Sequence, residues 1–461
     1  MGIIYLLPNC RVFLPGGLLS VDIHHRRLVY YNQKKPRLTR RTEVAMQLEI
    51  GFGNAPQTVE LPDENVLDVL YPNGIEAPED SAAEVARALS SPIGTLPLAE
   101  LAKGRKKVAI VTSDITRPMP SKVVLPLVLN ELFLAGISPQ DITVVFALGS
   151  HRKQTEEEKI RLAGEDVYRR VRCVDSADFD FVHMGSTKCG TPVDICRPVA
   201  EADLRICLGN IEYHYFAGYS GGAKAIMPGV STRAAIQANH SYMVKPNACA
   251  GVLDDNPLRE DLEDALNSCP VDFIVNVVLD EHKKIVHCVC GDVIEAHRAG
   301  CRLLDRYYRK NISRRADIVL VSQGGHPKDL NLYQTQKALE NAKYAVRDGG
   351  IIILVGSCNE GMGESTFEDW MLSANEPDDL IRRIEADFRL GGHKAAAIAL
   401  VLKKADIYLV SDMKADFVRQ IFMTPFSSVQ QALDEAFRVM GPKASVIVMP
   451  YGGSTLPHLS A

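Results

Sequence analysis

Apolar residues gather in short continuous runs of strand length, and longer amphipathic stretches separate these runs. The runs are rich in Val, Ile and Leu and show little alternation, which favours parallel strands buried on both faces of a sheet. We predict strands at 107–112, 142–148, 204–208, 273–279, 317–321, 351–355, 406–410 and 445–449.

The stretches between these runs carry apolar positions at helical spacing. Ser81 and Thr155 each stand three residues before a Glu, the spacing with which side chains cap a helix start. We predict helices at 81–89, 122–134, 155–163, 256–266, 296–309, 334–346, 377–386, 393–403 and 428–439.

Strand and helix alternate along the chain, which is typical of open α/β sheets. The 461 residues are enough for two or three domains, and the long charged helix before the strand at 317–321 marks a boundary. We therefore predict two α/β domains with mostly parallel sheets and an active-site cleft between them. The N-terminal domain spans 46–300 and the C-terminal domain spans 301–449, with a tail of about 450–461 packing back on the first.

The first 45 residues differ from the rest. Residues 1–46 hold eight Lys or Arg and two acidic residues, and Pro and Gly interrupt their apolar pieces. No continuous apolar segment leads to a cleavage site of small residues, so we do not expect a secretory signal. We predict that residues 1–45 are a disordered basic extension or follow a start codon assigned too early.

Composition narrows the class of protein. Hydrophobic residues make up 46% of the chain and the formal net charge is −5, which argues against disorder and against a surface built to bind nucleic acid. No run approaches the roughly 18 apolar residues that span a bilayer. The eleven Cys include no C-x-x-C pair, so we expect free thiols in a reducing cytoplasm.

Distinctive polar residues follow five of the predicted strands. In open α/β sheets, ligands bind beyond the carboxyl ends of the strands, so these clusters predict one crevice shared between the domains. The clusters are SDITRP (113–118), GSHR (149–152), GNIEYHY (209–215) with GYSGGAK (218–224), SQGGHPK (322–328) and GSCNEGMGE (356–364).

Two histidines in these clusters, His151 and His214, are candidate acid/base groups, because imidazole transfers protons near neutral pH. Arg117 and Lys337 are candidates for holding a carboxylate. Two bases facing each other across a small acid indicate a reaction symmetric about one carbon, such as a racemisation. The residues alone do not identify a cofactor.

Two other interpretations start from the glycine-rich segment. Gly218–Gly222 matches G-x-S-x-G, the nucleophile motif of α/β-hydrolases, with Ser220 as nucleophile. Lys224, which follows a glycine-rich turn, suits a phosphate, so a non-catalytic anion-binding protein is a further alternative.

Six segments in this order resemble the nickel-dependent lactate racemase family, from about Met46 to near the C-terminus. They are SDITRP (113–118), ALGSHRKQT (147–155), HYFAGYSGGAKAIMPG (214–229), NH (239–240), PKDLNLYQTQKAL (327–339) and GGHKA (391–395). Such proteins are two-domain α/β isomerases with the active site in the interdomain cleft.

The resemblance implies a nickel-pincer mononucleotide, a pyridinium thioamide/thiocarboxylate group that holds Ni(II). Lys224 would attach this group covalently, and His240 would supply the fourth nickel ligand in a tetragonal arrangement. The other roles that the resemblance implies are cofactor contacts by Asp114, Gly221 and Gly222, acid/base catalysis by His151 and His214, and substrate binding by Arg117, Tyr333, Gln334 and Lys337.

The resemblance further implies racemisation of a lactate-like 2-hydroxy acid by reversible hydride transfer. One histidine removes the hydroxyl proton, hydride leaves to the pincer ring, the planar keto acid turns, and hydride returns to its other face. A sugar-acid or malate-like 2-epimerase with the same cofactor is the alternative. The implied partners are a carboxylase, a sulfur transferase and a nickel insertase that mature the cofactor. A homo-oligomer is possible, and we expect no nucleic-acid or membrane partner.

Overall fold

The computed structural model describes residues 12–14, 17–22, 27–31, 45–74, 77–280 and 282–460. The chain divides into two units, residues 1–45 and 46–461. In the first unit, strands β1 (Val12–Leu14), β2 (Gly17–Asp22) and β3 (Arg27–Tyr31) form an antiparallel sheet. The other positions of this segment lie outside the described residues, so its expected disorder stays a prediction.

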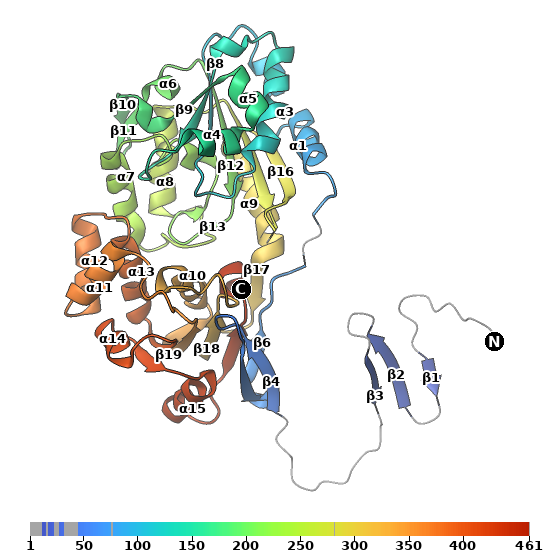
Figure 1. Ribbon diagram of the computed structural model, residues 1–461, viewed down its shortest axis with the longest axis vertical. Helices are drawn as coiled ribbons and strands as arrows, with labels where there is room; N and C mark the ends of the chain where they lie inside the picture. The colour runs from blue at the N-terminus through green and yellow to red at the C-terminus, as the bar shows by residue number, and fades with distance from the viewer. Residues whose placement is uncertain are drawn as a thin grey trace. The chain divides into compact units, whose positions relative to one another are not determined.

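The first large sheet of the 46–461 unit has the strand order β16-β15-β12-β7-β8-β9 (Figure 1). Five of its strands run parallel, and β16 pairs antiparallel with β15. Its strands are β7 (Val108–Ser113), β8 (Ile142–Ala147), β9 (Arg172–Asp175), β12 (Leu204–Ile211), β15 (Phe273–Leu279) and β16 (Ile285–Gly291). We call this sheet and its helices the first half.

The order of these strands reverses between β7 and β12. The chain builds β7, β8 and β9 outward on one side and then β12, β15 and β16 on the other. The helices of this half are α1 (Ser81–Ser90), α2 (Leu98–Leu101), α3 (Ser121–Leu134), α4 (Glu156–Ala163), α5 (Glu165–Arg170), α6 (Arg197–Ala200), α7 (Arg233–His240), α8 (Pro257–Asp264) and α9 (Glu295–Tyr308). Two small hairpins complete it, β10 (Phe181–Ser186) with β11 (Pro192–Cys196) and β13 (Tyr213–His214) with β14 (Gly218–Tyr219).

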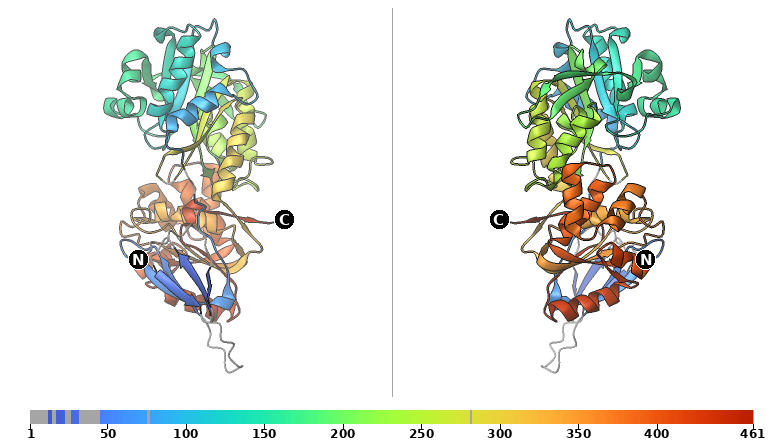
Figure 2. Two further views of the ribbon diagram at one scale, coloured as in Figure 1. Left: turned by 90° about the vertical axis from the view of Figure 1, so that its right-hand side faces the viewer. Right: turned by 90° about the vertical axis from the view of Figure 1, so that its left-hand side faces the viewer.

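The second large sheet is parallel throughout, in the order β21-β20-β19-β18-β22-β6. Its strands are β6 (Val66–Val69), β18 (Ala316–Ser322), β19 (Val346–Val355), β20 (Ala405–Val410), β21 (Thr424–Phe426) and β22 (Val446–Met449). Its helices are α10 (Leu332–Ala342), α11 (Ser365–Ser373), α12 (Pro377–Ala386), α13 (Gly392–Leu402), α14 (Ala415–Gln420) and α15 (Val429–Met440). This sheet and its helices form the second half, and Figure 2 shows the two sheets in separate parts of the unit.

Strands β4, β5 and β6 precede the first half in the sequence but belong to the second half. The hairpin of β4 (Ala45–Ile50) and β5 (Gln57–Pro62) packs on the second sheet, where Ile50, Val59 and Leu61 join its apolar core. Strand β6 then pairs with β22. At the other end of the chain, β23 (Leu456–Leu459) pairs with β17 (Arg309–Ile312). The domain limits at 46, 300 and 449 stay a prediction. Strand pairing joins β6 to the second sheet, and the β4–β5 hairpin joins it through apolar packing.

Both faces of the first sheet are buried, as the unbroken apolar runs predict. On β7, Ile110 packs with the cluster under α1, α2 and α3, whereas Val111 packs with the cluster under α6, α7 and α8. Both side chains are fully buried. The predicted class, α/β with mostly parallel sheets, is confirmed. No helix in the described part of the chain is long and apolar enough to cross a bilayer.

Candidate active site

The loops after β7 and β12 meet where the strand order of the first sheet reverses, the position at which open α/β sheets bind ligands. The loop after β7 carries Asp114 and Arg117, and the loop after β12 carries His214. The loop after the neighbouring strand β8 carries His151. Topology alone therefore gathers four of the predicted site residues at one edge.

Asp114 and His151 form a hydrogen-bonded pair. The Nδ1 of His151 lies 2.7 Å from Oδ2 of Asp114, and the other carboxylate oxygen accepts from the backbone and the hydroxyl of Thr116. Burial alone would raise the pKa of Asp114, but these hydrogen bonds outweigh it and lower the pKa below its usual value. Asp114 therefore stays a carboxylate, holds the proton of His151 on Nδ1, and leaves Nε2 as an acceptor. The hydrogen bonds of the Asp114 side chain go to His151 and Thr116, and its contact with a cofactor stays a prediction.

His214 presents the opposite tautomer. Its Nδ1 accepts a hydrogen bond of 3.3 Å from the backbone N–H of Ala217, so Nε2 carries the proton of the neutral ring. The ring packs edge-on against Phe216 at 4.4 Å between centroids. Burial lowers the pKa of His214 well below its usual value, and the charge of Arg117 adds to this effect. His214 is therefore neutral in this environment.

Lys224 lies in a short 3-10 turn, Gly222–Ala225, and its Nζ is 5.8 Å from the centre of the Phe216 ring. Burial lowers the pKa of Lys224 well below its usual value, and the positive charges of Arg259 and Arg117 lower it further. A neutral lysine amine is a nucleophile, whereas a protonated one is not. This environment suits an amine that forms a covalent bond.

His240 is the last residue of α7 and is 8% exposed. Its ring stands edge-on between Phe216 and Phe388, at centroid distances of 5.0 and 5.1 Å, and its buried Nδ1 has no hydrogen-bond partner within the described chain. Burial lowers the pKa of His240 well below its usual value, and the charge of Arg117 adds to this effect. A neutral imidazole with an unsatisfied nitrogen is the form that binds a metal ion.

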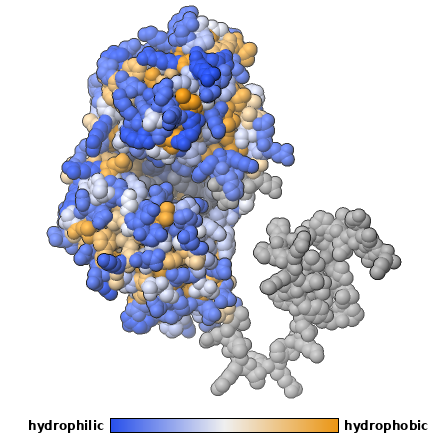
Figure 3. Space-filling model, viewed as in Figure 1, coloured by the Kyte–Doolittle hydropathy of each residue, from blue (hydrophilic) through white to orange (hydrophobic). Residues whose placement is uncertain are grey.

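The second half contributes the start of α10, where Tyr333, Gln334 and Lys337 lie within the first two turns. Burial lowers the pKa of Lys337; Glu212 opposes the shift, and the charge of Arg117 adds to it. The charge of the exposed Arg117 guanidinium also lowers the pKa of His214, Lys224 and His240. Arg117 therefore affects titratable groups from both halves. Figure 3 shows the surface hollowed between the two halves.

Gly221 and Gly222 have a packing role in this structure. Both have positive φ, at 75° and 57°, and the N–H of Gly222 donates to Asn276 Oδ1 at 2.8 Å. A Cβ on Gly221 would meet the Asn276 side chain at 2.6 Å, and one on Gly222 would meet the His297 ring at 2.8 Å. These contacts explain why side chains are excluded here, and a cofactor contact by either glycine stays a prediction.

Two residues of the GGHKA segment, which received no role from the sequence, also belong to this region. His393 stacks on Tyr215 with ring centroids 6.1 Å apart, and burial lowers its pKa to about 3. The buried Nζ of Lys394 donates to the Tyr333 carbonyl and to Gln336 Oε1, both at 2.9 Å, and lies over the Tyr333 ring. Lys394 therefore supports the start of α10. The motif match was the available signal for both residues.

Ser220 lacks the environment of a hydrolase nucleophile. Its Oγ donates to the Asn210 carbonyl at 2.7 Å and accepts from the Glu212 N–H at 2.9 Å, while His297 contacts only its backbone carbonyl. We expect Ser220→Ala to retain the activity of the wild-type protein and to lower the free energy of unfolding by about 1 kcal/mol for the lost hydrogen bonds. Activity assays and denaturant unfolding test this, and a complete loss of turnover in a folded Ser220→Ala protein would favour the hydrolase.

Comparison with known proteins gives one consistent family. The model described as lactate racemase N-terminal domain matches residues 52–251, and that described as lactate racemase C-terminal domain matches residues 312–456. The lactate racemase of Thermoanaerobacterium thermosaccharolyticum is 34% identical over 421 residues, covering 89% of this chain and 98% of that protein. The lactate racemase of Lactiplantibacillus plantarum is 32% identical over 426 residues, covering 88% and 98%.

A search of solved structures finds the same family. The lactate racemase apoprotein from Thermoanaerobacterium thermosaccharolyticum has a TM-score of 0.80 at 33% identity, covering 90% of this chain and 100% of that one. A protein from Thermotoga maritima has a TM-score of 0.59 at 18% identity, covering 85% and 100%, and shares the fold.

Proposed function

Because the chain belongs to the lactate racemase family, we propose that it interconverts the mirror-image forms of lactate or of a closely related 2-hydroxy acid. Membership of this family makes the protein an isomerase. The observation that carries the proposal is the grouping of Lys224, His214 and His240 around Phe216, where burial lowers the pKa of each.

We further propose that this region holds a nickel-pincer mononucleotide, with Lys224 as the attachment point and His240 as a nickel ligand. When bound, this group would accept a hydride from the α-carbon of the substrate and return it. The uncharged amine of Lys224 and the unpartnered Nδ1 of His240 both fit such a group. The described residues contain no group of three or more His, Cys, Asp or Glu side chains that could hold a metal by themselves.

In this proposal, His151 and His214 carry out the transfers of the substrate's hydroxyl proton. His151 would accept the hydroxyl proton at Nε2, and the carboxylate of Asp114 would stabilise the resulting imidazolium. From its Nε2–H, His214 would donate a hydrogen bond to the substrate oxygen while His151 holds the transferred proton. To take the hydroxyl proton of the opposite antipode, His214 would exchange protons with water, losing the one on Nε2 and gaining one on Nδ1, which breaks its hydrogen bond from Ala217.

Arg117, Lys337 and the side chains of Tyr333 and Gln334 would hold the substrate. An arginine can bind a carboxylate through two parallel hydrogen bonds, which fixes the acid while its carbon is planar. Among the described residues, Arg117 has no side-chain hydrogen bond or ion pair, so its guanidinium is available for a ligand.

The experiment is an isotope test on enzyme produced together with the cofactor-maturation enzymes. Enantiopure lactate with deuterium on the α-carbon is incubated in ordinary water, and both antipodes are separated and weighed by mass spectrometry. Hydride return predicts that the product antipode keeps the deuterium, whereas abstraction of an α-proton predicts its loss to solvent. Running malate and sugar acids in parallel separates a lactate racemase from an epimerase of larger acids.

A further inference from the structure

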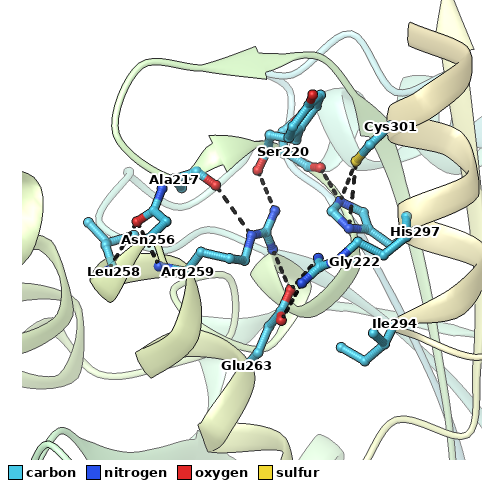
Figure 4. Close-up of polar contacts among 12 residues, drawn as sticks. Ala217, Ser220, Gly222, Asn256, Leu258, Arg259, Glu263, Ile294, His297 and Cys301 are labelled. Carbon is cyan, nitrogen blue, oxygen red and sulfur yellow. Dashed lines mark hydrogen bonds and ion pairs between the residues drawn. The ribbon is translucent and has the colours of Figure 1, made fainter. Parts of the chain in front are cut away.

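The loop between β12 and Lys224 is held by side chains that bind its backbone carbonyls one after another (Figure 4). Asn256 Nδ2 donates to the Phe216 carbonyl at 3.0 Å. Arg259 donates from Nε to the Ala217 carbonyl at 3.2 Å and from a terminal nitrogen to the Tyr219 carbonyl at 2.7 Å. His297 Nε2 contacts the Ser220 carbonyl at 2.8 Å.

Asn256 is fully buried, and every hydrogen-bonding group of its side chain is used. Its Oδ1 accepts from the N–H groups of Leu258 and Arg259 and so caps the start of α8. Its Nδ2 donates to the carbonyls of Phe216 and Val252, both at 3.0 Å. Two donors and two acceptors on opposite sides fix the orientation of the amide, because the reversed amide would place N–H against N–H.

One peptide group joins Asn256 to His214. The carbonyl of Phe216, which accepts from Asn256, belongs to the same peptide as the N–H of Ala217, which donates to His214 Nδ1 at 3.3 Å. Hydrogen bonds in such a chain polarise one another, so a donor on the carbonyl strengthens the N–H as a donor. Asn256 thereby acts on a histidine that its own side chain does not bond.

Arg259 keeps the rest of this loop in place. It is fully buried, and its carboxylate neighbour Glu263, at 3.5 Å, is also bound by Arg298 at 2.8 and 2.9 Å. A long charged side chain of this kind, when buried, is normally paired or hydrogen-bonded, and here backbone carbonyls serve as its acceptors. Because Asn256 and Arg259 both belong to the start of α8, one helix end fixes the loop from Phe216 to Tyr219.

We infer that Asn256, supported by Arg259, is a positioning residue that sets the ring orientation and the Nε2–H tautomer of His214 through the Phe216–Ala217 peptide. This inference builds on the proposed function, in which His214 is an acid/base group. The tautomer of His214 can be observed without turnover. The positioning role of Asn256 can therefore be tested independently of the catalytic role of His214.

The first measurement uses the full-length protein without cofactor, labelled with 15N on histidine. Nitrogen–proton correlation spectra distinguish protonated from unprotonated ring nitrogens, and a His214→Gln protein identifies the His214 signals. We expect the wild-type protein to show Nδ1 unprotonated and Nε2 protonated. A His214 ring protonated on Nδ1 in the wild-type protein would overturn the inference before any variant of Asn256 is made.

The second measurement uses Asn256→Asp, which keeps the cap of α8 but replaces both Nδ2 donors with a carboxylate oxygen. We expect the His214 Nδ1 signal to move to a position between the two tautomers. In matured enzyme we expect kcat to fall about tenfold with a smaller change in KM, the size of effect that outer hydrogen-bond partners of functional histidines have. A folded Asn256→Asp protein with an unchanged His214 signal would overturn the inference.

The matched control is Asn267→Asp, the same substitution at an exposed position just beyond α8, where the amide contacts only Asp264. We expect its His214 signals and its kcat to match those of the wild type. If His214→Gln keeps full activity while Asn256→Asp still shifts the tautomer, the proposed catalytic role of His214 fails and the positioning role of Asn256 stands.

Discussion

Lys224→Ala is expected to abolish activity and, with it, the mass increment of a covalently attached cofactor. The structure gives the reason: burial and two nearby arginine charges hold the pKa of the Lys224 amine well below its usual value, which favours the uncharged, nucleophilic form. Alanine at this position offers no atom for attachment. Intact-protein mass spectrometry after co-expression with the maturation enzymes measures the increment, and a chiral assay measures turnover.

The control for this prediction is Lys245→Ala, which removes an exposed lysine from the segment after α7. It should keep both the increment and full activity. Peptide mapping of the wild-type protein should locate the added mass on the peptide that contains Lys224. Active enzyme in which that peptide is unmodified would refute the attachment.

His151→Ala and His214→Ala are each expected to slow the interconversion of antipodes by about 10²- to 10⁴-fold, the usual contribution of a general acid or base. The expectation rests on their tautomers, since His151 offers a free Nε2 through its bond to Asp114 and His214 offers an Nε2–H. Chiral chromatography of each antipode, starting from either pure form, gives the rates in both directions.

The chain provides a matched control in His183, which lies 2.7 Å from Asp194 in the same kind of His–Asp pair but on the surface of the first half. His183→Ala should leave both rates unchanged. Retention of wild-type rates by folded His151→Ala or His214→Ala protein would remove the scheme of two proton-transferring histidines.

The sequence predicted the elements of the two large sheets well, because their signal is local. The predicted strand at 273–279 is β15, and the predicted helix at 377–386 is α12, with the same bounds. Unbroken apolar runs occur where a strand is covered on both faces, and this is visible in the residues themselves. None of the four residues of β6 is fully buried, and β4 and β5 alternate exposed with less exposed positions, so their apolar pattern is weaker.

The grouping of candidate site residues was also predictable in part. Polar residues that directly follow parallel strands come together whatever the loops between them do, which is why Asp114, His151 and His214 lie at one sheet edge. The bond from Asp114 to His151 was not predictable, because 37 residues separate the two side chains and no local pattern pairs them.

The side chains that hold the loop from Phe216 to Ser220 could not be predicted from the sequence. The helix at 256–266 was predicted as amphipathic, a pattern that places charged residues in solvent, yet Arg259 and Asp261 are 0% and 2% exposed. Arg259 can be buried because loop carbonyls accept hydrogen bonds from its guanidinium. Asp261 can be buried because its carboxylate accepts hydrogen bonds from Thr187, Thr191 and Asn239. Those partners lie 22 to 74 residues away in the sequence, so no local pattern contains them.

The early position of β4, β5 and β6 in the chain has a consequence for dissecting the molecule. A polypeptide starting at residue 312 would carry five strands of the second sheet and lack the sixth, leaving the backbone N–H and C=O groups along one side of β22 open. An unprotected strand edge of this kind recruits other chains. The apolar face normally covered by Ile50, Val59 and Leu61 would be bare as well. Starting the chain where the match to the C-terminal family model begins would therefore yield an aggregation-prone fragment. A soluble version needs residues 45–69 fused or supplied as a separate peptide.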